Sequence, residues 1–92
     1  MNQLLFFYLP TCPHCQLAIR LLKALKDGNP AYAQIPVTMI DESSEQVLAN
    51  SYDYWYVPCL FFNGEKLHEG HAEEEDVKRV LDKVLTASDT SA

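Results

Sequence analysis

Cys12 and Cys15, two cysteines three positions apart, are the residues of this chain best suited to chemistry. They follow an apolar run, 4–9, and precede a helical pattern, which places the pair at the start of a helix. There the two side chains lie on one face, one turn apart, and can close a small disulfide ring. Unpaired N–H groups at a helix start favour the thiolate of the first cysteine. The pattern predicts a thiol–disulfide redox site in which Cys12 is the nucleophile and Cys15 the resolving thiol.

The two residues between the cysteines, Pro13 and His14, are expected to tune this site. Pro13 suits the first helical turn, where its missing N–H costs nothing. Histidine titrates close to neutral pH, so His14 is predicted to favour the Cys12 thiolate through charge or a hydrogen bond. Its alternative interpretation is an exposed helix residue with little effect.

Cys59 is a third thiol with two open interpretations. It is either a small buried side chain on a strand or a thiol close enough to exchange with the active pair. A different class of function would use Cys12, Cys15 and Cys59 to bind a metal or an iron–sulfur cluster. We predict no metal site, and we interpret His68 and His71 as surface residues, because no second cysteine pair completes a tetrahedral set.

Size and charge narrow the class of protein further. The 92 residues predict one domain over 1–92, with a net charge of −6 and no basic cluster, so nucleic acid and anionic membranes are poor partners. No apolar run is long enough for a membrane span. The first three residues lack the positive charge of a secretory signal, so we expect a cytoplasmic protein, and a monomer.

Apolar spacing and turn residues predict the order β-α-β-α-β-β-α. A capping box of Ser43 with Gln46 would open the second helix, and Asn63-Gly64 would close a hairpin. The first three strands are expected to run parallel through right-handed crossovers, and the hairpin adds an antiparallel edge. Strands are predicted at 3–9, 35–40, 59–62 and 65–69, helices at 13–27, 43–51 and 73–85, a loop at 29–34, and a flexible tail at 86–92.

A second region carries a resemblance to a known family. Residues 52–58, Tyr-Asp-Tyr-Trp-Tyr-Val-Pro, and 61–65, Phe-Phe-Asn-Gly-Glu, resemble the thioredoxin superfamily, as does Gly70 before the last helix. The likeness extends from about residue 4 to residue 85. Thr11, directly before the first cysteine, is the residue that glutaredoxins usually have there. The resemblance implies a thioredoxin-like three-layer α/β sandwich, with a four-stranded mixed sheet and helices on both faces.

The resemblance also implies how a substrate would bind. Pro58 would be a cis-proline facing the cysteines, and the backbone of Val57 would pair with an extended substrate chain. Thr11 and Trp55 complete the predicted substrate-binding set. The tyrosines and tryptophan of 52–56 are either core residues or an exposed docking surface beside Pro58.

The implied activity is thiol–disulfide oxidoreduction on protein or peptide disulfides. Glutaredoxins carry a glutathione-binding lysine where this chain has Leu9, and Ala72 offers no side-chain hydrogen bond at the last helix. We therefore expect weak selectivity for glutathione. The cysteine pair is its own redox couple, so no organic cofactor is required, and a reductase or glutathione would supply electrons. A glutathione-dependent glutaredoxin is the alternative within the superfamily.

Overall fold

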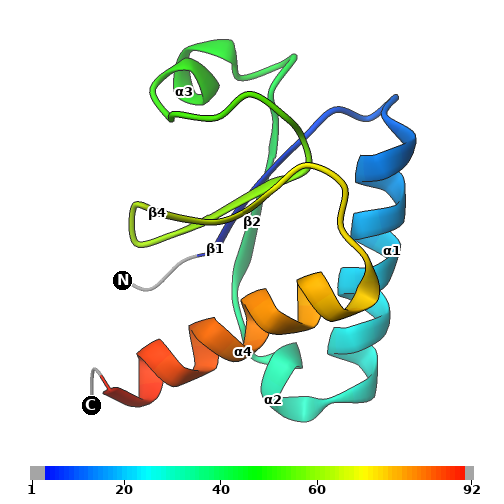
Figure 1. Ribbon diagram of the computed structural model, residues 1–92, viewed down its shortest axis with the longest axis vertical. Coiled ribbons are helices and arrows are strands. Elements are labelled where there is room, and N and C mark those ends of the chain that lie inside the picture. Colours follow the sequence, from blue (N-terminus) through cyan, green and yellow to red (C-terminus); the bar gives the residue numbers. More distant parts are fainter. Residues whose placement is uncertain (1–3, 91–92) are drawn as a thin grey trace.

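The computed structural model describes residues 4–90, which form a four-stranded sheet covered by helices (Figure 1). Gln3, assigned above to the first strand, and the tail residues 91–92 lie outside the described residues. Within 4–90, no helix is both long and apolar enough to cross a bilayer. The strands are β1 (Leu4–Tyr8), β2 (Val37–Asp41), β3 (Cys59–Phe62) and β4 (Glu65–Glu69), and the helices are α1 (Pro13–Gly28), α2 (Pro30–Ala33), α3 (Gln46–Asn50) and α4 (Glu74–Thr90).

The sheet is mixed, with the strand order β2-β1-β3-β4. β2 runs parallel to β1, as expected, and β4 pairs antiparallel with β3. The expectation that the third strand is parallel to the first is wrong, because β3 pairs antiparallel with β1 and Phe7 lies opposite Cys59.

The connection from β2 to β3, residues 42–58, stays at one end of the sheet. It contains α3, whose five residues extend about 7.5 Å along the helix axis. The chain enters β3 at the end of the sheet where it left β2 and runs in the opposite direction.

Each face of the sheet buries its own core, which confirms the predicted three layers. Alternate residues of β1 point to opposite faces, so Phe6 belongs to one core and Phe7 to the other. α1 and α4 cover the Phe6 face with the stripes Ala18–Leu22 and Val77–Val84. α3 covers the Phe7 face through Ala49, and in Figure 1 it lies apart from the other three helices.

Two local predictions are corrected. The segment 29–34 is not all loop, since one helical turn, α2, forms after Asn29, whose side-chain oxygen accepts the N–H of Ala31 at 2.9 Å. The capping box also fails, because α3 begins at Gln46. Ser43 instead donates its N–H and its hydroxyl to the carboxylate of Asp41, which is the stronger acceptor and closes a local turn.

The last two boundaries concern the hairpin and α4. Asn63 and Gly64 both have positive φ, 53° and 83°, so the predicted hairpin is confirmed. α4 continues to Thr90, beyond the expected end at residue 85.

β1, β2 and β4 end, and β3 begins, at the same end of the sheet. The connecting loops after Tyr8, Asp41 and Glu69 and before Cys59 therefore meet there.

Candidate active site

The two cysteines occupy the predicted place at the start of α1, at the loop-bearing end of the sheet. Cys12 is the N-cap residue, Pro13 opens the helix, and Cys15 lies one turn along. Cys12 is partly exposed, whereas Cys15 is completely buried. The turn is closed by the N–H of Cys12, which donates to the carbonyl of Leu9 at 3.1 Å. A substrate disulfide can therefore reach only the first sulfur directly.

The helix start lowers the pKa of Cys12. No hydrogen bond caps the helix in the thiol form, but the N–H of Cys15 favours the thiolate most strongly. Burial raises the pKa by the next-largest effect, and the Cys15 thiol and the N–H of His14 lower it by smaller ones. These N–H groups belong to the first helical turn, where they have no acceptor within the helix.

Burial has the opposite effect on Cys15. Loss of solvent raises the pKa of its thiol to about 11, although the N–H of Leu9 donates to Sγ at 3.5 Å and partly compensates. The negative charges of the Cys12 thiolate and of Glu42 raise it further. The pair therefore combines one accessible thiol with a lowered pKa and one buried thiol that stays protonated at neutral pH.

Titration of the reduced protein, followed by thiolate absorbance, should resolve this difference. One thiol is expected to ionise below an ordinary cysteine, whose pKa is about 8.5. Cys15 and Cys59 are expected to ionise only near 11 and 12. Cys12→Ser should remove the first step and, because the Cys12 thiolate no longer raises the pKa of Cys15, move the Cys15 step to lower pH. A first step at or above the ordinary value would contradict the role of the helix start.

The side chain of His14 is exposed and contacts the loop after β4. Its backbone N–H favours the Cys12 thiolate, but its imidazole is exposed and Nδ1 lies 2.8 Å from Nδ1 of His71. His71 also contacts the carboxylate of Glu73, and its carbonyl lies 3.0 Å from Nε2 of His68. His71, interpreted above as a surface residue, thus links the loop after β4 to the start of α1.

Cys59 lies in the core on the Phe7 face, together with Ile40 and Phe61. α1, which carries Cys15, packs against the other face through Ala18 and Leu22. Burial raises the pKa of Cys59 to about 12. The geometry favours the interpretation as a small buried side chain. In residues 4–90, no group of three or more His, Cys, Asp or Glu side chains could hold a metal ion.

The predicted substrate-binding residues lie at the same end of the sheet as the cysteines. The Val57–Pro58 peptide bond is cis, which confirms that prediction, and Pro58 is buried while Val57 is half-buried. Thr11 is exposed in the turn before Cys12. In the described part of the chain, the backbone of Val57 makes no hydrogen bond, so it is available to an extended peptide.

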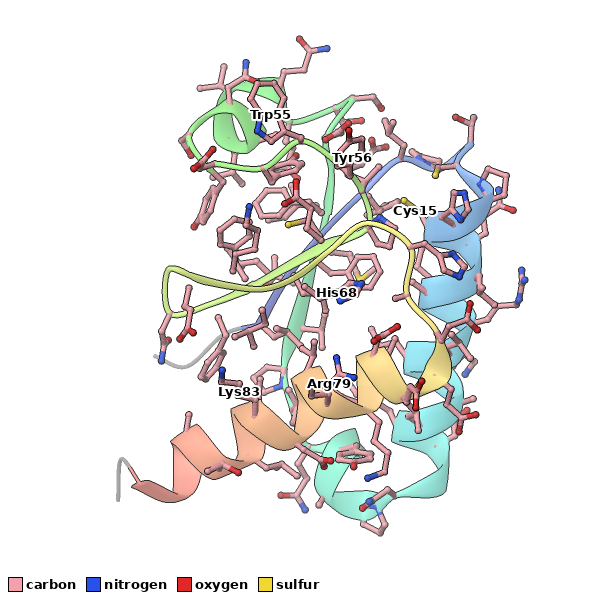
Figure 2. All side chains as sticks on the ribbon, in the orientation of Figure 1. Cys15, Trp55, Tyr56, His68, Arg79 and Lys83 are labelled. Carbon is pink, nitrogen blue, oxygen red and sulfur yellow. The ribbon has the colours of Figure 1, made fainter. Side chains whose placement is uncertain are left out.

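The aromatic residues of segment 52–56 include both core residues and exposed residues, the two interpretations that the sequence left open. Tyr52 and Tyr54 pack on Phe7, with ring centroids 5.0 Å away in each case. Trp55 is 85% exposed and Tyr56 70% exposed, and Figure 2 shows both at the end of the molecule that also holds Cys15. The segment therefore supplies two core residues and two surface rings.

Glu69 is a residue that the sequence did not single out. Its Oε2 accepts the N–H groups of Trp55 and Tyr56, the latter at 3.0 Å, and its Oε1 accepts Lys66 Nζ at 2.8 Å. The hydrogen bond from Lys66, followed by those from the two N–H groups, lowers the pKa of Glu69 from 4.5 to about 2. This carboxylate holds the backbone of the two residues that carry the exposed rings.

Glu69→Gln is expected to loosen residues 55–56 at neutral pH, because the charged acceptor is lost. Amide exchange at Trp55 and Tyr56 should accelerate. Since the folded pKa lies below the ordinary one, the wild-type contacts stabilise the fold above pH 4.5 and are lost as the pH falls towards 2. Glu65→Gln, on the same strand, should leave both amides unchanged. Equal exchange in both variants would contradict the role of Glu69.

A model of the glutaredoxin family matches residues 4–67, and this stretch includes the cysteine pair, Thr11 and the cis-proline. The chain belongs to the glutaredoxin family. No curated protein sequence matches this family member closely.

Solved structures place this glutaredoxin-family chain in the thioredoxin fold. It is similar to a mutant thioredoxin from Halobacterium salinarum, with 28% identity, a TM-score of 0.67, and coverage of 91% of this chain and 74% of the other. It is also similar to a protein disulfide oxidoreductase from Aeropyrum pernix, with 28% identity, a TM-score of 0.61, and coverage of 97% and 38%. The Deadhead thioredoxin of Drosophila melanogaster shares the fold at 21% identity and a TM-score of 0.70, over 89% and 79%.

Proposed function

We propose that this protein is a thiol–disulfide oxidoreductase that acts on protein or peptide disulfides. One observation carries the proposal: Cys12 is accessible with a lowered pKa, while Cys15, one turn away, is buried with a pKa of about 11. A dithiol of this kind attacks with one sulfur and resolves with the other. The likeness to a protein disulfide oxidoreductase supports the same class of reaction.

The reaction proceeds in two exchanges. The Cys12 thiolate attacks one sulfur of the substrate disulfide, and the other sulfur leaves as a thiolate that takes a proton from water. Cys15 then gives up its proton and attacks Cys12, which breaks the mixed disulfide and releases the second substrate thiol. The substrate gains two electrons and two protons, and the protein is left with a Cys12–Cys15 disulfide. A reductase or glutathione in a reducing compartment, which we propose to be the cytoplasm, would restore the dithiol.

The surroundings of Cys12 favour a polypeptide over glutathione. Val57 offers an unpaired backbone, and the exposed rings of Trp55 and Tyr56 suit an extended chain. Glutathione carries two carboxylates, which need cations or aimed donors. Leu9 lies at the position of the usual lysine, and Ala72 is 1% exposed, so neither supplies one.

Two assays on one preparation test the proposal. We expect reduction of insulin disulfides with a dithiol donor, and little reduction of a glutathionylated small thiol with glutathione. Cys12→Ser should abolish both. Efficient turnover of the small glutathionylated substrate without insulin reduction would make glutathione the substrate and overturn the proposal.

A further inference from the structure

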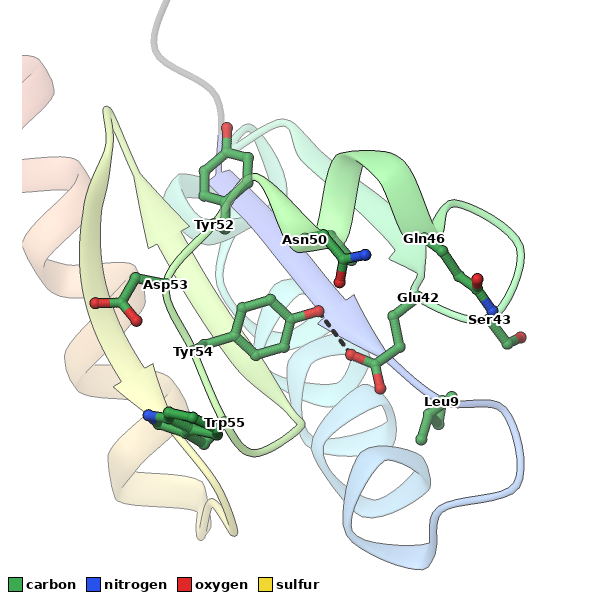
Figure 3. Close-up of a pocket in the computed structure, with 10 residues that line it drawn as sticks. Leu9, Glu42, Ser43, Gln46, Asn50, Tyr52, Asp53, Tyr54 and Trp55 are labelled. Carbon is green, nitrogen blue, oxygen red and sulfur yellow. Dashed lines mark hydrogen bonds between the residues drawn. The ribbon is translucent and has the colours of Figure 1, made fainter.

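A pocket of about 550 Å³ reaches the turn that precedes Cys12 and has no role in the exchange described above. Figure 3 shows its position between three segments that meet at the loop-bearing end of the sheet. Leu9 comes from the turn that precedes Cys12, Glu42 follows β2, and Tyr54 and Trp55 come from the loop before the cis-proline. α3 closes the remaining side with Gln46 and Asn50. The pocket therefore adjoins the turn before Cys12. It also adjoins the loop that leads to Val57, whose backbone is proposed to pair with the substrate.

The charge of the pocket is negative. Its lining includes two carboxylates, Glu42 and Asp53, and no lysine, arginine or histidine. The Lys66 ammonium reaches the carbonyl of Asp53 at 3.2 Å, but its charge is already matched by Glu69 at 2.8 Å. The whole chain has a net charge of −6. An anionic ligand would be repelled here, whereas a cation would be attracted.

Glu42 has a free acceptor in this pocket. Tyr54 donates its hydroxyl to Oε1 of Glu42 at 2.6 Å, which fixes the carboxylate, as the dashed line in Figure 3 shows. Tyr54 is itself held by the Phe7 ring. In the part of the chain that the structure describes, Oε2 of Glu42 has no hydrogen-bond partner. A held carboxylate with one open oxygen is suited to bind an ammonium or guanidinium group.

An exposed indole borders the same pocket. Trp55 borders the pocket with 85% of its surface exposed, although its backbone is held by Glu69. The face of tryptophan attracts cations, and its flat surface also covers the methylene stem of a long side chain. An aromatic wall and a carboxylate together favour a lysine or arginine side chain over a simple cation.

We propose that this pocket binds a lysine or arginine side chain of the substrate polypeptide, a few residues from the disulfide that Cys12 attacks. The inference rests on the proposed function and names its substrate class. Trp55 is two residues from Val57, which is about 7 Å along an extended chain. A peptide paired with Val57 thus carries its neighbouring side chains past the pocket mouth, within reach of a long basic one.

The test compares peptide disulfides on one enzyme preparation. A panel of otherwise identical peptides carries lysine at each of the four positions on either side of the cystine, and a matched panel carries glutamine. At one or two positions on one side, lysine should raise kcat/KM about five- to tenfold over glutamine, the combined effect of a cation–π contact and a partly exposed ion pair. The preference should shrink as salt is added.

Two variants assign the preference to the pocket. Glu42→Gln should reduce the ratio of kcat/KM for the lysine peptide to kcat/KM for the glutamine peptide by at least half. Trp55→Ala should reduce this ratio further, whatever either substitution does to the absolute rate. Glu75→Gln, which removes the same charge from exposed α4, should leave the ratio unchanged. Equal ratios near one at every position, or a preference that Glu42→Gln leaves intact, would overturn the inference. The proposed function would fail separately, if neither panel were reduced.

Discussion

Cys15→Ser is expected to accumulate mixed disulfides with its substrates, whereas Cys12→Ser should accumulate almost none. Cys12 is accessible with a lowered pKa, so it attacks first, and without Cys15 the mixed disulfide cannot be resolved. In Cys12→Ser the remaining thiol of the pair is completely buried. Burial, the largest cause of the raised pKa of Cys15, persists in this variant and disfavours its thiolate.

Non-reducing electrophoresis followed by mass spectrometry would measure the trapped species. The matched control is Cys59→Ala in the Cys15→Ser background, which should trap as much as the single variant, because Cys59 is buried on the other sheet face. Similar trapping by Cys12→Ser and Cys15→Ser would contradict the assigned roles, and loss of trapping in the control would give Cys59 a part in the exchange.

Phe7→Ala is expected to cost about 3–5 kcal/mol of the free energy of unfolding, the usual loss for a buried phenylalanine. Phe7 is completely buried, and its ring touches three others, those of Tyr52, Tyr54 and Phe61. The cost is a large part of the stability of a small domain, which is about 5–15 kcal/mol. Because Tyr54 also positions Glu42, the substitution should weaken the pocket as well.

Chemical denaturation monitored by circular dichroism would give the two free energies. Trp55→Ala is the matched control, since it also removes an aromatic ring but one that is 85% exposed. It should change the free energy of unfolding by no more than about 0.5 kcal/mol. A loss below about 1 kcal/mol for Phe7→Ala, or equal losses for both variants, would contradict the assignment of Tyr52 and Tyr54 to the core around Phe7 and of Trp55 to the surface.

Local patterns predicted much of this fold. The cysteine pair, the Asn63-Gly64 hairpin and the apolar stripes all depend on residues close in sequence, and the structure places each as expected. The cis state of Pro58 was expected from the resemblance to a family. The direction of β3 was missed because it depends on the path of residues 42–58 between β2 and β3, and the apolar pattern of the strand does not encode that path.

The candidate site was predicted less completely, because its missing parts depend on contacts between distant segments. Glu69 reaches Trp55, and His71 reaches His14 across 57 positions of sequence. Neither contact leaves a local signal. Glu42 could have been found, because it follows a strand parallel to β1, and the carboxyl ends of parallel neighbours meet at one edge. The same rule would have placed it beside Leu9.

The placement of the connecting loops has a consequence for protein engineering. The cysteine turn, the Glu42 pocket and the cis-proline loop all occupy one end of the sheet, whereas the Asn63-Gly64 turn and α2 lie at the other. Asn63 and Gly64 are both exposed. A peptide tag or a second domain inserted at this turn would be grafted on the side away from the chemistry. Substrate specificity could thus be altered at the end with the cysteine turn, while an added tag or domain is carried at the Asn63-Gly64 turn.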